Sequence, residues 1–562
     1  MLHLIPAVRS LTQTGGVLNA AALRFDHSAL PSRLVNALKA IPQSQDGAPL
    51  SITFGEGNGE AYTLTVTESA VCIVADSERA AFLAIQTLRQ LFANGTVPCL
   101  EIKDSPDFAY RGFYHDVTRG RIATVETIKM LIDTMAYYKM NALQLYVEHV
   151  FPFRETADLV PHTGCLTGEE LEELDRYCSE RFIDFQPSLS TFGHLFELLE
   201  LPQYNHLRVL KDFTPCTCRW YDRMMHHTID PRSPESIEIV KSLIDQYMPH
   251  FSNEYFNICC DETFDLKEVD PEGKLYLDFV KKIIAHVTGK GKRVMMWADI
   301  LLKHPDCIEA LPEDTLFLNW SYRAEPPEEN VARFAKLGRP QIVCPGTTSW
   351  SRFCERVERE EPNILKLAEY GYKHGAIGML NTNWGDYGNP CAIETALYGL
   401  VLGAAKSWAI GTQANEAFYA DVNALLYRNE NAMRYLTAMS DAHNEIGWNK
   451  IMLAAYNQRN GLPFEAPLTA EAVEQAQQMY RDLRAQLAAD TWSTGDFKEE
   501  FLLAAQGICV LAELGAKLSG ITVERLTDTK DFLARYRAKW MEKNKESELS
   551  RIEDIFLYCD TL

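Results

Sequence analysis

Two carboxylates stand next to each other behind an apolar run, Asp261 and Glu262 in the segment YFNICCDETFDL at residues 255–266. Carboxylates of this kind suit acid–base chemistry, in which a positioned side chain gives a proton to a reacting group or takes one from it. Neighbouring side chains on a strand point to opposite faces. The two carboxylates can therefore reach two parts of one ligand only if the strand ends where they stand.

Other residues that could do chemistry also stand beside apolar runs of strand length. They are Arg111 and Asp116 at the first run, Glu148 and His149 at the second, His194 at the third, Trp297 and Asp299 at the fifth, Trp320 and Tyr322 at the sixth, Trp350 at the seventh, and Trp384 and Asp386 at the eighth. Taken singly, a Trp at a strand end is more often packing, and an Asp there is often the N-cap of the next helix. Together, aromatic faces with carboxylates and an arginine describe a sugar pocket, since a pyranose has one apolar face and a ring of hydroxyls.

The elements that must position these residues alternate between strand and helix. The strand-like runs cover residues 111–117, 142–149, 184–194, 255–262, 293–300, 315–322, 341–350 and 376–386. Helix start signals lie between them, such as Thr167 with Glu170 and Ser233 with Pro234. Alternation predicts parallel strands with right-handed crossovers, and eight units close a TIM barrel, whose chemistry gathers at the carboxyl ends of the strands. An open doubly wound sheet is the weaker alternative, because no Gly-rich phosphate loop follows the first run.

The barrel is flanked by two other kinds of sequence. Residues 62–92 read as two alternating strands and a helix, and residues 470–489 have the composition and periodicity of a helix. We therefore expect an α/β fold with a (β/α)8 TIM barrel at residues 105–412, a small N-terminal α+β domain at 1–104 and a C-terminal helical domain at 413–562.

Six motifs carry a resemblance to a known family. In chain order they are RGFYHDVTRG, YYKMNALQLYVEH, STFGH, CCDETFDL, MMWADI and NTNWGDYG. Together they resemble the barrel of family 20 glycoside hydrolases, the β-N-acetylhexosaminidases. The segment FLAIQTLRQLF resembles that family's non-catalytic α/β domain, so the resemblance spans about residues 50 to 410, and the helical tail is more loosely similar to bacterial intracellular members.

The resemblance implies how adjacent carboxylates could serve one reaction. An ordinary retaining glycosidase sets two carboxyls about 5 to 5.5 Å apart across the scissile bond, which adjacent residues cannot do. Family 20 instead uses the 2-acetamido oxygen of the substrate as the nucleophile. By resemblance, Glu262 is the general acid and then the general base, and Asp261 orients the acetamido N–H and stabilises the charge that develops there.

The resemblance also implies roles for the other candidates. Arg111 resembles the family arginine that binds the C3 and C4 hydroxyls, and Asp386 the acid that binds the C4 and C6 hydroxyls. Trp297, Trp320 and Trp384 wall the acetamido pocket, with Trp384 under the sugar ring. His194 and Glu148 form a chain behind Glu262 that keeps its pKa suited to proton donation. Tyr322 is the candidate donor to the acetamido oxygen, with Trp350 near the place where that Tyr is often found.

The chain departs from the family pattern at three places. The fourth run has Asn257 and Cys259 where H-x-G-x-D-E is usual, inside the strand, where they bear on packing more than on chemistry. The second run shows Glu148-His149 in place of two acidic residues. The third departure is the choice between Tyr322 and Trp350, which hydroxyl-donor geometry alone can settle.

Composition and charge exclude several classes of partner. The chain has 562 residues and a formal net charge of -22, which opposes binding to nucleic acid or an anionic membrane. The first residues lack the pattern of a secretory signal, and residues 501–520 read as a buried helix, so a cytoplasmic protein with no membrane span is expected.

Fourteen irregularly spaced cysteines suit reduced core thiols, and Cys216 and Cys218 lack a second ligand pair for a metal. We expect no metal or cofactor.

The leading hypothesis is an exo-acting β-N-acetylhexosaminidase that removes terminal β-linked GlcNAc or GalNAc from oligosaccharides or glycoconjugates. A second hypothesis is a barrel glycosidase of another family, with Glu262 as acid and a distant nucleophile such as Asp386, acting on sugars without the acetamido group. A third is a non-catalytic carbohydrate-binding barrel. The sequence leaves the GlcNAc or GalNAc preference, the linkage and the assembly open, a homodimer included.

Overall fold

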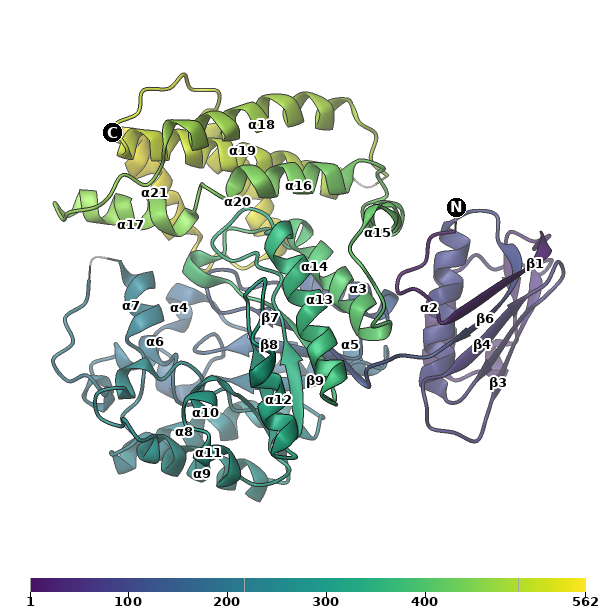
Figure 1. Ribbon diagram of the computed structural model, residues 1–562, viewed down its shortest axis with the longest axis horizontal. Coiled ribbons are helices and arrows are strands. Elements are labelled where there is room, and N and C mark those ends of the chain that lie inside the picture. The colour runs from purple at the N-terminus through teal and green to yellow at the C-terminus, as the bar shows by residue number, and fades with distance from the viewer. Residues whose placement is uncertain (1, 217, 494) are drawn as a thin grey trace.

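The computed structural model describes residues 2–216, 218–493 and 495–562. Three parts follow one another along the chain: a six-stranded sheet with its helices, a closed eight-stranded barrel, and a group of C-terminal helices. In Figure 1 the N-terminal sheet lies to the right of the barrel and the C-terminal helices lie above it. The expected fold class is confirmed. The expected boundary at residue 104 coincides with the end of strand β6, and that at 412 falls between helices α14 and α15.

The N-terminal sheet is mixed and has one helix-covered face. Its strands are β1 (Ser10–Val17), β2 (Leu23–Arg24), β3 (Ala48–Phe54), β4 (Tyr62–Val66), β5 (Val71–Ala75) and β6 (Pro98–Asp104), in the order β1-β6-β4-β5-β3-β2. Its helices are α1 (Ser32–Leu38) and α2 (Glu78–Ala93). The side chain of Ser77 caps α2 by accepting the N–H of Ala80, and α2 packs on β3, β4 and β5. The two strands and the helix expected within residues 62–92 are present.

The barrel strands are all parallel and nearly all buried. They are β7 (Tyr110–Asp116), β8 (Ala142–Val147), β9 (Asp184–Leu189), β10 (Tyr255–Asn257), β11 (Arg293–Trp297), β12 (Leu316–Trp320), β13 (Gln341–Cys344) and β14 (Gly378–Asn383). The eight expected runs are confirmed as strands, and all eight end earlier than expected. Strand β14 pairs with β7 and closes the barrel at Gly378, where a Cβ would lie 1.9 Å from the carbonyl oxygen of Tyr110.

Helices follow each barrel strand and cover the outside of the barrel. The longer ones are α3 (Val125–Tyr137), α5 (Gly168–Ser179), α8 (Pro234–Tyr247), α9 (Lys274–Gly289), α12 (Glu328–Lys336), α13 (Val357–Lys373) and α14 (Leu397–Trp408). The shorter ones are α4 (Val160–Thr163), α6 (Phe196–Leu199), α7 (Arg219–Met225), α10 (Asp299–Lys303) and α11 (Asp306–Glu309). The predicted capping box of Thr167 and Glu170 and the start of α8 at Ser233 and Pro234 are confirmed.

The C-terminal part is helical, as expected. It comprises α15 (Glu416–Val422), α16 (Ala432–His443), α17 (Trp448–Arg459), α18 (Ala470–Ala489), α19 (Gly495–Leu518), α20 (Thr529–Lys543) and α21 (Leu549–Thr561). Helix α19 is long and apolar enough to cross a membrane by composition, yet most of it is buried against α16, α17, α18, α20 and α21. The prediction of a buried helix at residues 501–520 is confirmed, and this helix is the core of the domain.

Candidate active site

A pocket of about 130 Å³ lies at the carboxyl ends of the barrel strands. Its wall contains nine of the residues expected from the sequence, namely His194, Asp261, Glu262, Trp297, Trp320, Tyr322, Trp350, Trp384 and Asp386. Two residues that the sequence reasoning did not select, Arg119 and Met224, complete the wall. Two expected residues, Arg111 and Glu148, lie elsewhere.

The adjacent carboxylates meet at one imidazole. Strand β10 ends at Asn257, four residues before Asp261, so the strand rule that sends neighbours to opposite faces no longer applies to the pair. Glu262 has a positive φ of 48°, which turns the backbone between the two side chains. The Nε2 atom of His194 lies 3.4 Å from Oδ2 of Asp261 and 3.5 Å from Oε2 of Glu262. The Asp261 side chain is 10% exposed and that of Glu262 26% exposed, so the outer carboxylate is the one more open to a ligand.

His194 is held as a cation by its surroundings. Burial alone lowers its pKa, but the carboxylates of Asp261 and Glu262 outweigh burial and raise the pKa to about 10. The ring of His227 stacks on that of His194 at 4.2 Å, and Nδ1 of His227 accepts the backbone N–H of His194 at 2.7 Å. Burial and the neighbouring imidazolium hold the pKa of His227 well below its usual value. The stack therefore pairs a charged imidazole with a neutral one.

Asp299 is a third carboxyl behind the pair. Its Oδ2 accepts the backbone N–H of Glu262 at 3.2 Å, and its Oδ1 is buried without a hydrogen bond to the described residues. Burial, followed by the charges of Asp261 and Glu262, raises the pKa of Asp299 to about 7. Asp299 stands at the end of the fifth predicted run, where the sequence predicts no role for it. The structure gives it one, because it fixes the backbone of Glu262.

The raised pKa of Asp299 predicts a pH-dependent stability. Because the folded state binds this proton more tightly than the unfolded chain, the stabilisation is complete below the ordinary pKa of 3.8 and is lost as pH rises through about 7. In Asp299→Asn the neutral amide can still accept the N–H of Glu262, so this loss should disappear. Denaturant unfolding at pH 5 and pH 8 measures the free energy of unfolding of both proteins. Relative to the native protein, the variant's free energy of unfolding should rise between these pH values by at most about 1.4 kcal/mol per pH unit. If the free energies of unfolding of variant and native protein differ by the same amount at pH 5 and pH 8, Asp299 does not have a raised pKa.

Five of the eleven residues in the pocket wall are Trp or Tyr. Trp320 stacks on Tyr322 at 5.0 Å, Trp350 meets Tyr322 edge-on at 5.2 Å, and Trp297 lies 5.8 Å from Trp384. The hydroxyl oxygen of Tyr322 accepts a hydrogen bond from Nε1 of Trp384 at 2.6 Å. Its own proton is therefore left to donate to an acceptor in the pocket. Flat apolar faces with one positioned hydroxyl suit a sugar carrying a small polar substituent.

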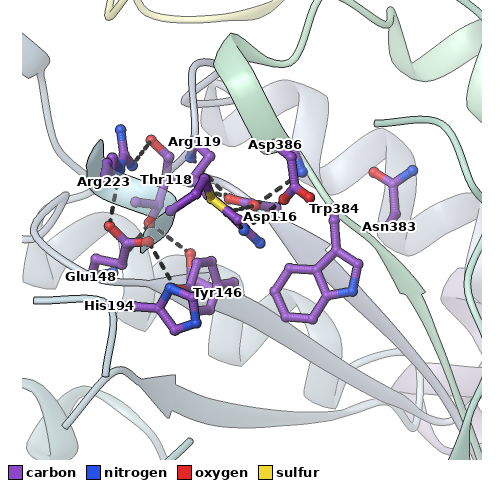
Figure 2. A network of polar contacts seen from close by, with 12 residues as sticks. Asp116, Thr118, Arg119, Tyr146, Glu148, His194, Arg223, Asn383, Trp384 and Asp386 are labelled. Atoms are coloured by element: carbon purple, nitrogen blue, oxygen red, sulfur yellow. Dashed lines mark hydrogen bonds and ion pairs between the residues drawn. The ribbon is translucent and has the colours of Figure 1, made fainter. Parts of the chain in front are cut away.

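An arginine and an aspartate lie in the same wall. Nη1 of Arg119 lies 2.6 Å from Oδ1 of Asp386, and Nε of Arg119 donates to Oδ2 of Asp116 at 2.7 Å. The guanidinium also lies over the rings of Trp384 and Tyr146, at 4.7 and 4.9 Å. Figure 2 shows Arg119 close to Asp116, with Asp386 and Trp384 nearby. Such a cation and carboxylate offer both donors and acceptors to neighbouring hydroxyls.

The assignment of Arg111 as the sugar-binding arginine is wrong. Arg111 is the second residue of β7, so it lies at the amino end of the barrel, opposite the pocket. Its guanidinium is buried and donates to the carboxylate of Glu60 in the N-terminal domain and to the carbonyls of Phe108 and Lys139. Arg111 joins the N-terminal domain to the barrel. Arg119 stands in the pocket because it follows the carboxyl end of the same strand.

Glu148 does not line the pocket, and it lies behind the wall, where its charge acts on His194, as expected for a chain behind Glu262. The Oε1 atom of Glu148 accepts the hydroxyl of Tyr146 at 2.8 Å, and its Oε2 accepts Nε of Arg223 at 3.3 Å. Burial raises the pKa of Glu148, but Arg223 and His149 outweigh burial and hold it well below its usual value. Glu148 is therefore an anion that supports the ring of Tyr146, and Tyr146 meets His194 edge-on at 6.2 Å.

One usable signal for the missed residues was present in the sequence. Arg119 lies three residues after Asp116, beyond the end of the first run, where barrel chemistry is expected. Arg111 begins that run. Met224 and Arg223, in contrast, come from the long connection after the third strand, and no motif marks them.

The pocket contains a set of atoms that could hold a cation. One donor atom each from His194, Asp261 and Glu262 lies within 4.8 Å of the others. With its pKa at about 10, His194 carries a proton that already balances the two carboxylates, and a metal ion would have to displace that proton. The three side chains therefore fit proton transfer better than metal binding.

Two models of one known family match this chain. The model described as "Glycosyl hydrolase family 20, catalytic domain" matches residues 108–365, and "Glycosyl hydrolase family 20, domain 2" matches residues 2–105. The chain belongs to glycoside hydrolase family 20. The expected resemblance is thereby confirmed, and the family 20 catalytic match covers the strands that carry Arg119, His194, Asp261 and Glu262.

Family 20 relatives and structures agree with this placement. A β-hexosaminidase of Porphyromonas gingivalis is 27% identical over 285 residues, which is 43% of this chain and 36% of the relative. One from Akkermansia muciniphila is 32% identical over 158 residues, 24% of this chain and 32% of the relative. The chain thus spans about a third of the length of these relatives. The X-ray structure of Flavobacterium johnsoniae chitobiase shares the fold over 100% of this chain and 99% of its own, with 16% identity and a TM-score of 0.61.

Proposed function

We propose that the protein is an exo-acting β-N-acetylhexosaminidase, which removes terminal non-reducing β-linked GlcNAc or GalNAc by substrate-assisted retaining catalysis. Family membership and the names of its relatives support the class of enzyme. One observation carries the proposal most directly: the carboxylates of Asp261 and Glu262 converge on one protonated imidazole in a pocket walled by aromatic rings. Terminal N-acetylhexosamines of oligosaccharides or glycoconjugates are the proposed substrates.

The first step forms a cyclic intermediate from the substrate itself. Glu262, the more exposed carboxyl, enters this step protonated and gives its proton to the leaving glycosidic oxygen while the acetamido carbonyl oxygen attacks the anomeric carbon. Asp261 accepts the acetamido N–H and stabilises the positive charge of the resulting oxazolinium ion. Tyr322 donates its free hydroxyl proton to the acetamido oxygen, which holds that oxygen in position for attack.

The second step reverses the roles. Glu262, now ionised, takes a proton from water, and the water oxygen attacks the anomeric carbon and reopens the ring with retained configuration. The imidazolium of His194 stays within 3.5 Å of Glu262 and balances the negative charge that appears there. Arg119 and Asp386 bind hydroxyls of the same sugar ring from the opposite wall, and Trp384 supports its apolar face.

The two alternative functions remain distinguishable. In the second hypothesis Asp386 is the nucleophile, but its carboxylate is 2.6 Å from Arg119 and is thereby committed to an ion pair. The third hypothesis, a sugar-binding barrel without activity, would not need a proton donor beside the pocket mouth. The ion pair and the open position of Glu262 both favour the substrate-assisted enzyme.

A comparison of three nitrophenyl glycosides tests the proposal. The β-GlcNAc and β-GalNAc substrates should be cleaved, whereas the β-glucoside should be essentially inert because it lacks the internal nucleophile. Comparable rates on the β-glucoside would favour a protein nucleophile. Binding of GlcNAc without release of nitrophenol from any of the three would favour the non-catalytic barrel.

A further inference from the structure

The C-terminal helical domain reaches the loop that carries Arg119. The segment at residues 544–548, between α20 and α21, runs beside that loop, and the backbone N–H of Lys545 donates to the carbonyl of Ile122 at 2.8 Å. Figure 1 places the C-terminal helices against one side of the barrel, above it in this view. The last residue of this segment, Glu548, points into the contact and is buried.

Glu548 takes part in a buried polar network with Arg223. Its Oε2 accepts Nε1 of Trp220 at 3.1 Å and Nη1 of Arg223 at 3.2 Å. The other two nitrogens of Arg223 bind barrel residues. Nε donates to Glu148 at 3.3 Å, and Nη2 donates to the carbonyl of Thr118 at 3.3 Å. Figure 2 shows Arg223 beside Thr118 and Glu148. A buried guanidinium with this many partners has one favoured position, since each lost partner leaves a donor without water.

The position of Arg223 bears on the pocket through two routes. Thr118 precedes Arg119, and its hydroxyl also donates to the carbonyl of Tyr146 at 2.9 Å, so the loop is held from both sides. Met224 follows Arg223 and lines the pocket, and Nη1 of Arg119 lies 3.5 Å from its sulfur. A shift of Arg223 would therefore displace both the loop before Arg119 and the side chain beside it.

The loop that carries Asp386 touches the same helical domain. Nε1 of Trp448 in α17 donates to the carbonyl of Tyr387 at 2.7 Å, and Tyr387 has a positive φ of 61°. A Cβ on Gly388 would lie 2.7 Å from the ring of Trp220, so this loop packs tightly on the residue that donates to Glu548. Both sugar-facing loops thus rest on the C-terminal domain.

We propose that Glu548 is a positioning residue for the Arg119–Asp386 pair, so that the C-terminal helical domain sets the affinity for the terminal sugar. The inference rests on the proposed function of that pair in binding hydroxyls. Glu548 itself touches no substrate. It acts by fixing Arg223, and through Arg223 the loop and the methionine on either side of Arg119.

The first test is a pair of substitutions at Glu548. Glu548→Ala removes the acceptor of Trp220 and Arg223 and should raise KM for nitrophenyl β-GlcNAc about tenfold, the effect expected from one hydrogen bond to a charged group. The kcat should change little, because contacts to hydroxyls made equally in the ground and transition states affect KM alone. Glu548→Gln keeps an acceptor oxygen and should restore most of the affinity. Titration calorimetry with GlcNAc should give the same order of affinities.

A matched control lies two residues earlier. Glu546 pairs with Arg537 at the surface, at 3.2 Å, and has no contact that leads to the pocket among the described residues. Glu546→Ala removes the same side chain from the same segment and should leave KM unchanged. If it raises KM as much as Glu548→Ala does, the effect is a general loosening of the segment, and the positioning role is wrong.

Other outcomes are equally decisive. An unchanged KM and GlcNAc affinity in folded Glu548→Ala would overturn the proposal, as would a fall in kcat and a rise in KM that Gln does not reverse. If Glu548→Ala does not fold, Trp220→Phe removes one donor alone and should raise KM in the same direction. Wild-type protein that binds GlcNAc without cleaving it would refute the proposed enzyme but not the positioning role, whereas protein that neither binds nor cleaves would refute both.

Discussion

Asp261→Asn is expected to lower kcat by about 10²- to 10³-fold on nitrophenyl β-GlcNAc, the loss typical of removing one preorganised electrostatic partner. The amide keeps the shape of the carboxylate but can no longer balance the positive charge on the oxazolinium ion. The side chain is buried beside His194, so water cannot replace the lost charge. Asp278→Asn, the same change at an exposed position of α9, should leave kcat unchanged.

An inhibitor separates this mechanism from a protein nucleophile. A thiazoline that mimics the cyclised intermediate should inhibit native protein strongly and Asp261→Asn much more weakly, because transition-state-like ligands recover contacts that substrates do not. The result that excludes substrate assistance is a thiazoline without effect together with a fluorosugar that becomes attached to a carboxylate. Asp386 would then be the first residue to examine for the adduct.

Glu262→Gln should lower kcat by about 10²- to 10⁴-fold on a natural disaccharide, since the amide cannot donate a proton to the leaving oxygen. The loss should be smaller for nitrophenyl substrates, because nitrophenolate leaves without protonation. Steady-state rates on both substrate types measure this difference. Glu268→Gln, an exposed glutamate six residues further on, is the matched control. An equal loss on both substrate types would mean that Glu262 does not act as the acid.

The barrel could be predicted because its signals are local. Each of the eight runs is apolar and of strand length, and each is followed by a helix with start signals that the structure bears out at Thr167 and Ser233. Strand length was less well predicted, because apolar residues continue past the last ladder bond. In β10 the run goes on to Cys260, but the strand ends at Asn257, backbone hydrogen bonds to β11 continue only through Ile258 and Cys259, and the positive φ values of Cys259 and Cys260 then turn the chain.

The site was predicted in part for the same reason. Residues beyond the carboxyl ends of barrel strands share one rim, so their order in the chain was enough to bring Asp261, Trp297, Trp384 and Asp386 together. The rule does not apply to Arg111, since it is the second residue of its strand and lies at the amino end. Glu148 follows the carboxyl end of β8, yet it lies behind the pocket wall. Tyr146 and Arg223 hold its carboxylate away from the pocket.

The sequence by itself determined the class of fold, the adjacent acid pair and the aromatic wall, since these follow from residue type and from periodicity over a few residues. Only the tertiary structure decided that Arg119 is the arginine of the pocket, that burial raises the pKa of Asp299 to about 7, and that Glu548 reaches the barrel. These features depend on burial and on contacts between distant parts of the chain. Glu548 and Arg223 are 325 residues apart, and chain closure over such a distance leaves no local signal for a sequence to carry.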